Sequence, residues 1–143
     1  MKQPLDMVQF RMINIEVPQY AILADRCPDS LENMQVNAQV AFAADAPHHA
    51  VACKMRFVFK DPENALEAIE IICAFEVSNE DWGKFSNGTK TTIPQSFLTH
   101  IAFHTAGTAR GVLYAKSEKT PFARIILPPI NVEEMVKSDM VIE

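Results

Sequence analysis

The feature that most constrains the fold is residues 92–116, which place apolar or small side chains on two sides of one helix. Phe97 begins one row at three- and four-residue steps, and Leu98 begins a second row beside it. Gly107 and Gly111 lie in the same stretch, although a glycine inside a helix costs about 1 kcal/mol relative to alanine. The pattern predicts a long helix that is covered on more than one face, either inside an oligomer or on its own sheet. The residues predicted for an oligomer interface are Phe97, Ile101, Ala102, Thr105 and Ala109.

Local signals delimit this helix and predict the elements after it. Thr92 and Gln95 have the spacing of a capping box, in which each side chain bonds a backbone N–H of the other residue. A charged run and a proline end the helix, because a proline disfavours helical geometry in the residue before it. Residues 122–127 are apolar but too few for a helix before two prolines, so we predict an extended strap. Asn131 has Glu134 at the capping-box spacing and predicts a short C-terminal helix.

The first half of the chain alternates apolar and polar side chains, which is typical of strands with one buried face. Residues 7–24 are extended in pattern, with a proline that fits an edge strand. The alternation is clean over residues 34–42, 51–59 and 69–77. Strands first and helices last predict the α+β class: a four-stranded antiparallel sheet with a long helix and a short C-terminal helix packed on one face. We expect residues 78–91 to form a loop.

Length and charge narrow the class of protein. A chain of 143 residues without a repeat or linker predicts one domain over residues 1–143. The net charge of −5, with no cluster of Lys or Arg, argues against a nucleic-acid partner. The N-terminus lacks the apolar core of a signal peptide, and no run reaches membrane-spanning length, so we expect a cytoplasmic protein without membrane insertion.

The residues that could carry chemistry are few. Cys27, Cys53 and Cys73 match neither a disulfide framework nor a zinc pattern, and we expect the last two to be buried. His100 and His104 share a helix face and could bind a metal, but no third ligand is near in sequence. We therefore predict no catalytic residue, metal or cofactor. The alternative is a small-molecule-binding or enzymatic α+β protein with these two histidines near its site.

The amino-acid sequence of the helix and strap resembles that of the protein-export chaperone SecB and its SecB-like relatives. The shared features are a helix started by Pro94, small and basic residues at 107–111, Thr-Pro-Phe at 120–122 and Leu-Pro-Pro-Ile-Asn at 127–131. The order of elements is also similar: strand, crossover loop, three-strand meander, long helix, strap and short helix. The first half of the chain agrees with the family in its pattern of apolar and polar residues more than in residue identity. The chain therefore resembles the divergent SecB-like members.

This resemblance implies a cytoplasmic homotetramer, a dimer of dimers, that holds unfolded or partly folded polypeptides in apolar grooves without ATP. A holdase needs exposed apolar surface and a net charge that keeps it dissolved. Docking to the translocation motor SecA through sheet carboxylates is also implied, with Glu67 and Glu70 as candidates. Some relatives guard an antitoxin instead, which leaves a role with one specific partner open. The candidates for the groove are Tyr20, Ile22, Leu23, Ile69, Ile71 and Ile130.

Overall fold

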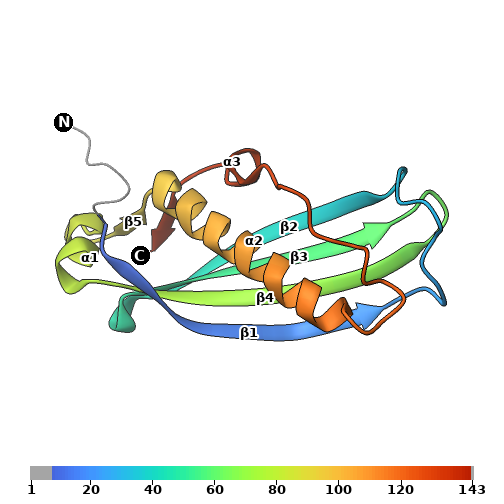
Figure 1. Cartoon of the computed structure of the whole chain (residues 1–143). Helices are drawn as coiled ribbons and strands as arrows, with labels where there is room; N and C mark the ends of the chain where they lie inside the picture. The colour runs from blue at the N-terminus through green and yellow to red at the C-terminus, as the bar shows by residue number, and fades with distance from the viewer. Residues whose placement is uncertain (1–7, 143) are drawn as a thin grey trace.

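The computed structural model describes residues 8–142, which form a four-stranded antiparallel sheet with α2 and α3 on one face (Figure 1). The strand order is β1-β4-β3-β2, so β1 and β2 are the edges, and β5 and β6 form a separate pair. The predicted α+β class is confirmed. In chain order the elements are β1 (Phe10–Ile22), β2 (Gln35–Asp45), the 3-10 turn η2 (Ala46–His48), β3 (Ala50–Lys60), β4 (Ala65–Val77), α1 (Asn79–Phe85), β5 (Thr91–Ile93), α2 (Gln95–Ser117), α3 (Val132–Met135) and β6 (Met140–Ile142).

The edge strand β1 departs from regular pairing at two places. Its register to β4 shifts between Met12 and Asn14 and again between Glu16 and Gln19. Such shifts are typical of β-bulges, and Pro18, which has no N–H to donate, lies in the second one. Because an extra residue reverses the alternation of side chains, two bulges keep the apolar residues on the face that carries α2. These residues are Phe10, Met12, Ile15, Val17, Tyr20 and Ile22.

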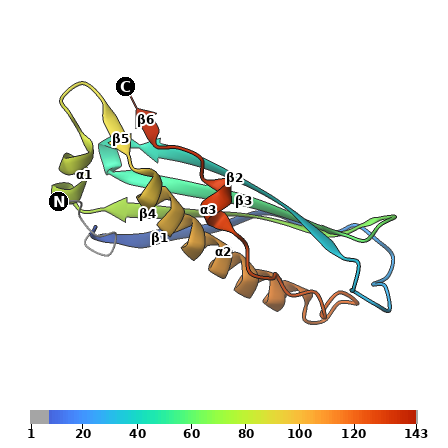
Figure 2. The same cartoon turned by 90° about the horizontal axis from the view of Figure 1, so that it is seen from above.

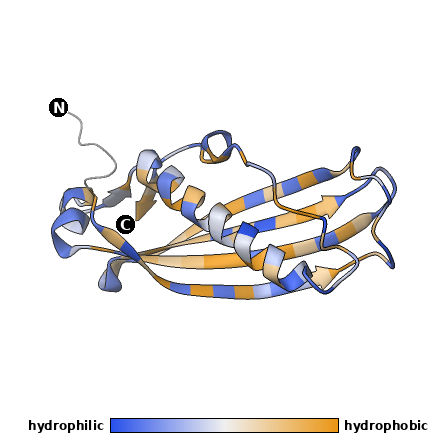
Figure 3. Ribbon diagram, in the orientation of Figure 1, coloured by the Kyte–Doolittle hydropathy of each residue, from blue (hydrophilic) through white to orange (hydrophobic). Residues whose placement is uncertain are grey.

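The core lies between the sheet and α2, which runs across one face (Figure 2). Figure 3 shows apolar residues recurring along β3 and β4. Cys53 and Cys73 are opposite each other in register and both fully buried, which confirms their predicted place in the core. The strap after α2 adds buried Phe122, Ile125 and Leu127 to the same layer. The buried sheet residues on this face include Val51, Met55, Phe57, Phe59, Ile69, Ile71, Phe75 and Val77.

The N-terminus of α2 is not held by the predicted capping box. Thr92 lies in β5, and Pro94 is the N-cap residue, without a side-chain hydrogen bond. The backbone N–H of Gln95 donates to Asp139 Oδ1 at 2.7 Å, and the Gln95 side-chain amide donates to the carbonyl oxygen of Val136 at 2.7 Å. The C-terminal segment therefore supplies the acceptors that a local cap was expected to supply. This is a long-range contact, which spacing in the sequence does not reveal.

Residues 78–91, predicted to be a loop, contain α1 and β5. Ser78 Oγ accepts the N–H of Asp81 at 3.2 Å and so caps α1. Trp82 and Phe85 on this helix are buried and anchor it to the core. The predicted cap at Asn131 is confirmed, because its side chain accepts the N–H of the residue three positions on at 3.4 Å. Within residues 8–142, no helix combines the length and apolarity needed to cross a membrane.

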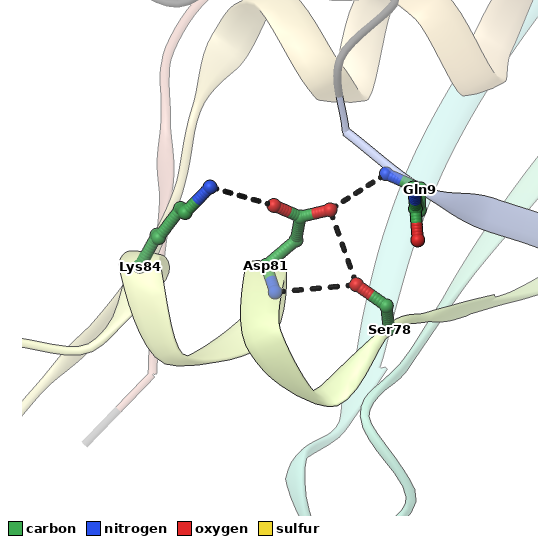
Figure 4. Close-up of polar contacts among 4 residues, drawn as sticks. All are labelled: Gln9, Ser78, Asp81 and Lys84. Carbon is green, nitrogen blue, oxygen red and sulfur yellow. Dashed lines mark hydrogen bonds and ion pairs between the residues drawn. The ribbon is translucent and has the colours of Figure 1, made fainter.

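Asp81 connects α1 to the beginning of β1 (Figure 4). Its Oδ2 accepts the backbone N–H of Gln9 at 2.8 Å and the hydroxyl of Ser78 at 3.1 Å, and its Oδ1 lies 3.1 Å from Lys84 Nζ. The hydrogen bond from the Gln9 N–H, helped by Lys84 and Ser78, holds the pKa of Asp81 below its usual value. Asp81 is thus a charged group that stabilises the end of the sheet opposite the loop between β1 and β2.

Candidate functional site

The apolar face of β1 is only partly covered by α2, the helix that packs on this face. α2 contacts mainly β3 and β4, so some side chains on the same face of β1 remain exposed to solvent. Ile15 is 48% exposed and Ile22 is 43% exposed, although each lies opposite a buried residue of β4. Leu23, the residue directly after the strand, is 50% exposed. We call Ile15, Tyr20, Ile22 and Leu23 the apolar edge.

The side of α2 that is turned away from the sheet also carries apolar residues. Phe103 and Tyr114 are about half exposed, and the exposed Gly107 and Gly111 lie between them at helical spacing. A Cβ added at either glycine would have no atom within 4 Å. Packing within the subunit therefore does not require glycine at these positions. We call Phe103, Gly107, Gly111 and Tyr114 the outer face of α2.

Several residues predicted for a groove or an interface are in the core instead. Ile69 and Ile71 point beneath α2 and have almost no exposed surface, so they are not available to a client. Ile130 lies just before α3 and is partly buried against the core. Alternation identifies the apolar face of a strand but not the element that covers it. The five residues predicted for an oligomer interface are likewise fully buried in their own subunit: Phe97, Ile101, Ala102, Thr105 and Ala109.

The two carboxylates predicted as one docking site lie on opposite faces of β4. Glu70 is on the face of the sheet that α2 does not cover, which we call the open face. Its carboxylate there is 3.1 Å from Lys54 Nζ and 3.8 Å from Arg56 Nε. Glu67 has the parity of the buried residues and is 0% exposed beneath the C-terminal end of α2. Glu67 therefore cannot contact a partner on the open face, and Glu70 alone of the pair reaches it.

Glu67 is the meeting point of three elements. Its Oε1 accepts the hydroxyl of Ser117 at 2.5 Å and the hydroxyl of Tyr20 at 3.3 Å, and these two hydroxyl oxygens are 3.4 Å apart. Its Oε2 is buried and has no hydrogen-bond partner among residues 8–142. Burial raises the pKa of Glu67, and the two hydroxyls oppose this effect only in part.

The histidine pair of α2 belongs to an aromatic cluster. The ring centroid of His100 is 4.9 Å from that of His104, and Phe10 lies within 5.4 Å of the first and 5.7 Å of the second. No group of three or more His, Cys, Asp or Glu side chains that could hold a metal occurs in the part of the chain that the structure describes. A groove of about 620 Å³ beside His100 is lined by Pro94, Gln95, Ser96, Thr99, Phe103, Glu133 and Asp139.

Solved structures place this architecture among known folds, although no protein-family model and no curated protein sequence matches the chain. A SecB-like chaperone of Mycobacterium tuberculosis, solved in complex with a ChAD peptide from the HigA1 antitoxin, matches 85% of this chain and 90% of its own, with a TM-score of 0.55 and 13% identity. This chain has a SecB-like fold. The resemblance in the helix and strap is thereby confirmed at the level of the fold. A protein of unknown function from Streptococcus agalactiae covers 87% of this chain and 98% of its own, with a TM-score of 0.40 and 14% identity.

Two parts of the exposed apolar surface of this SecB-like fold were not predicted. The outer face of α2 has a sequence signal, because Phe103, Gly107 and Gly111 follow one another at four-residue steps. The alternation of apolar and polar residues gives no such signal for Ile15. The bulges in β1 change which residues of the strand point inward, and a prediction from alternation depends on that order. Of the predicted groove residues, the apolar edge contains Tyr20, Ile22 and Leu23.

Proposed function

We propose that this chain is an ATP-independent chaperone that binds non-native polypeptide segments at the apolar edge. The observation that carries the proposal is that Ile15, Ile22 and Leu23 are exposed beside the half-buried Tyr20, at an edge of the sheet whose α2 face is otherwise largely buried. Apolar surface of this kind accepts many sequences, because the hydrophobic effect is not directional. The outer backbone groups of the edge strand β1 offer an extended peptide hydrogen bonds in addition.

The SecB-like fold supports this proposal, since the Mycobacterium tuberculosis protein with that fold is a chaperone solved with a bound peptide. That peptide comes from an antitoxin, which favours a second candidate: a chaperone that serves one specific partner. A role in protein export belongs to the first candidate, with Glu70 on the open face as the residue offered to SecA. A cytoplasmic location is part of the same proposal.

We further infer a homo-oligomer, a dimer of dimers, in which the outer face of α2 packs against another subunit. Gly107 and Gly111 each cost about 1 kcal/mol of helix stability relative to alanine, and among residues 8–142 no atom lies within 4 Å of a Cβ added at either position. A neighbouring backbone that approaches α2 between Phe103 and Tyr114 would use that space and cover both aromatic side chains.

The test is dilution of a chemically denatured protein into buffer without ATP, with aggregation followed by light scattering. Wild type is expected to suppress aggregation, and the double variant Ile22→Ser/Leu23→Ser is expected to lose this effect while remaining folded. Val141→Ser is the matched control, because Val141 is 54% exposed in β6, which lies at the end of the sheet opposite the loop between β1 and β2 (Figure 2). Equal suppression by both variants would show that the apolar edge is not the binding surface.

Absence of suppression by wild type at excess chaperone would exclude a general holdase. A pull-down from its own cell then decides whether one specific partner is bound. The same Ile22→Ser/Leu23→Ser variant serves as its control, because capture through the apolar edge is expected to disappear in it.

A further inference from the structure

We propose that Glu67 is a proton-operated latch that holds the C-terminal end of α2 on the sheet and controls how far the apolar edge is exposed. The proposal deepens the polypeptide-binding function above and rests on it. The latch itself is a property of the subunit, so it can be tested without any client.

The latch consists of one carboxyl group that joins three elements. Glu67 is on β4, Ser117 is the last residue of α2, and Tyr20 belongs to the apolar edge on β1. Both hydroxyls converge on the same oxygen, Oε1, at 2.5 Å and 3.3 Å. This one acceptor therefore connects the end of α2 to both β4 and β1.

The surroundings of Glu67 provide little to balance a negative charge. β3 places the buried Phe59 opposite it. From α2, Lys116 directs its Nζ to 5.9 Å from the ring centroid of Tyr20, and Thr120 after the helix donates its hydroxyl to the carbonyl oxygen of Ser117 at 2.8 Å. Within residues 8–142, no ion pair reaches Glu67, and Tyr20 is a phenol whose own pKa is raised by burial.

Oε2 is the atom that makes the arrangement sensitive to protons. It is buried and has no hydrogen-bond partner in the described part of the chain. A neutral acid tolerates this far better than a carboxylate, whose charge needs donors at both oxygens. When Glu67 ionises, water can reach Oε2 if the Ser117 end of α2 moves off the sheet. The Ser117 hydroxyl then leaves the Tyr20 hydroxyl as well as Glu67, and with the end of α2 off the sheet the adjoining Ile22 and Leu23 become more exposed.

The direction of the pH effect follows from the raised pKa of the closed state. Opening returns Glu67 to an ordinary environment, with a pKa of about 4.3, so opening favours loss of one proton. The opening equilibrium is therefore smallest in acid, rises about tenfold per pH unit between the ordinary and the raised pKa, and levels off above the latter. Lower pH closes the latch and higher pH opens it.

Amide hydrogen exchange of the ligand-free protein, corrected for the intrinsic pH dependence of exchange, measures this equilibrium. Two reporters are the N–H of Leu23, bonded to the carbonyl oxygen of Leu66 at 2.8 Å, and the N–H of Thr120, bonded to that of Ser117 at 2.9 Å. In wild type, opening at both is expected to rise with pH and then level off. The N–H of Trp82, in α1 at the other end of the sheet, is expected to show no such rise.

Three variants make the test specific. Glu67→Gln keeps the shape but cannot ionise, so its opening should be independent of pH, whereas Glu63→Gln, at an exposed carboxylate in the β3–β4 turn, should behave as wild type. Ser117→Ala removes a hydroxyl that lowers the pKa of Glu67. The pH at which the opening equilibrium levels off should therefore be higher in this variant than in wild type. A flat wild-type profile, or a Glu67→Gln profile that rises like wild type, would overturn the latch.

Binding of an extended apolar peptide, measured over the same pH range, separates the latch from the proposed function. Affinity that rises with opening in wild type and stays flat in Glu67→Gln supports control of the apolar edge. Constant affinity while the amides open would overturn that control. Failure to bind the peptide at any pH would count against the proposed function, and the amide profiles would still decide the latch.

Discussion

The carboxylate of Asp81 accepts the backbone N–H of Gln9 at 2.8 Å, across a separation of 72 residues. The same oxygen takes the hydroxyl of Ser78, and the other oxygen pairs with Lys84. One side chain thus closes the end of the sheet by fixing the start of β1 to α1. Asp81 is 4% exposed, so solvent cannot readily replace its hydrogen bonds.

Substitution Asp81→Asn is expected to lower the free energy of unfolding by about 1.5–3 kcal/mol at neutral pH, the usual contribution of hydrogen bonds to a charged group. Because the folded-state pKa is lowered, this contribution is present above the ordinary value of about 3.9 and is lost as pH falls through the folded pKa. Urea unfolding at pH 7 and in acid measures both effects. Glu80→Gln, at the exposed neighbour, is the control, and an undiminished difference at pH 2 would contradict the explanation.

Ile69→Ala and Ile22→Ala separate the core from the candidate client surface. Ile69 is 1% exposed, so its truncation should cost about 2–5 kcal/mol of stability. Ile22 is 43% exposed, and its truncation should change stability by no more than about 0.5 kcal/mol while it weakens peptide binding. Urea unfolding and peptide titration give the two readouts. A large loss of stability in Ile22→Ala would place this residue in the core.

Arg110→Ala is expected to loosen the strap. Arg110 Nε donates to the carbonyl oxygen of Leu127 at 2.8 Å, and one terminal nitrogen donates to that of Pro128 at 3.3 Å. Removing a partly exposed charged donor should cost about 1–2 kcal/mol and increase proteolysis between residues 118 and 131. Arg110→Lys should not restore protection fully, because an ammonium lacks the fork geometry. Unchanged proteolysis in Arg110→Ala would show that the buried strap residues suffice.

The two helix glycines test the inferred assembly. In an isolated subunit Gly111→Ala should raise the free energy of unfolding by about 1 kcal/mol, because a new Cβ meets nothing within 4 Å. Gly107→Glu should reduce the oligomer mass measured by light scattering after gel filtration, because it places a charge in the inferred interface. Ser138→Glu, at an exposed site after α3, is the control. An unchanged mass in Gly107→Glu would remove the outer face of α2 from the interface.

Local periodicity predicted most of the fold. The alternation over residues 51–59 and 69–77 matches the buried face of β3 and β4, and the long helical pattern matches α2. The errors arise where distant contacts decide the structure. Asp139 replaces Thr92 as the acceptor at the start of α2, and α1 forms within the predicted loop because Trp82 and Phe85 reach the core.

The candidate site was harder to predict, because exposure depends on which element covers a face. Ile22 and Ile69 are both apolar strand residues, yet α2 covers only the second. The prediction that Glu67 shares a docking site with Glu70 could have been avoided from the sequence alone. Glu67 has the parity of Ile69 and Ile71 in the strand and must share their face. Its hydroxyl partners Tyr20 and Ser117 are 47 and 50 residues away in the chain, and no local pattern connects them.

The two register shifts in β1 bear on how this strand is compared with others. Residues 10–12, 14–16 and 19–22 are three short ladders, each with its own phase relative to β4. Deletion of Ile13 would place Met12 two positions before Ile15, so a regular strand without the first bulge would keep both residues on the inward face. Alignments of β1 therefore need freedom to place a one-residue gap at either irregularity, and an ungapped match there would pair inward residues with outward ones.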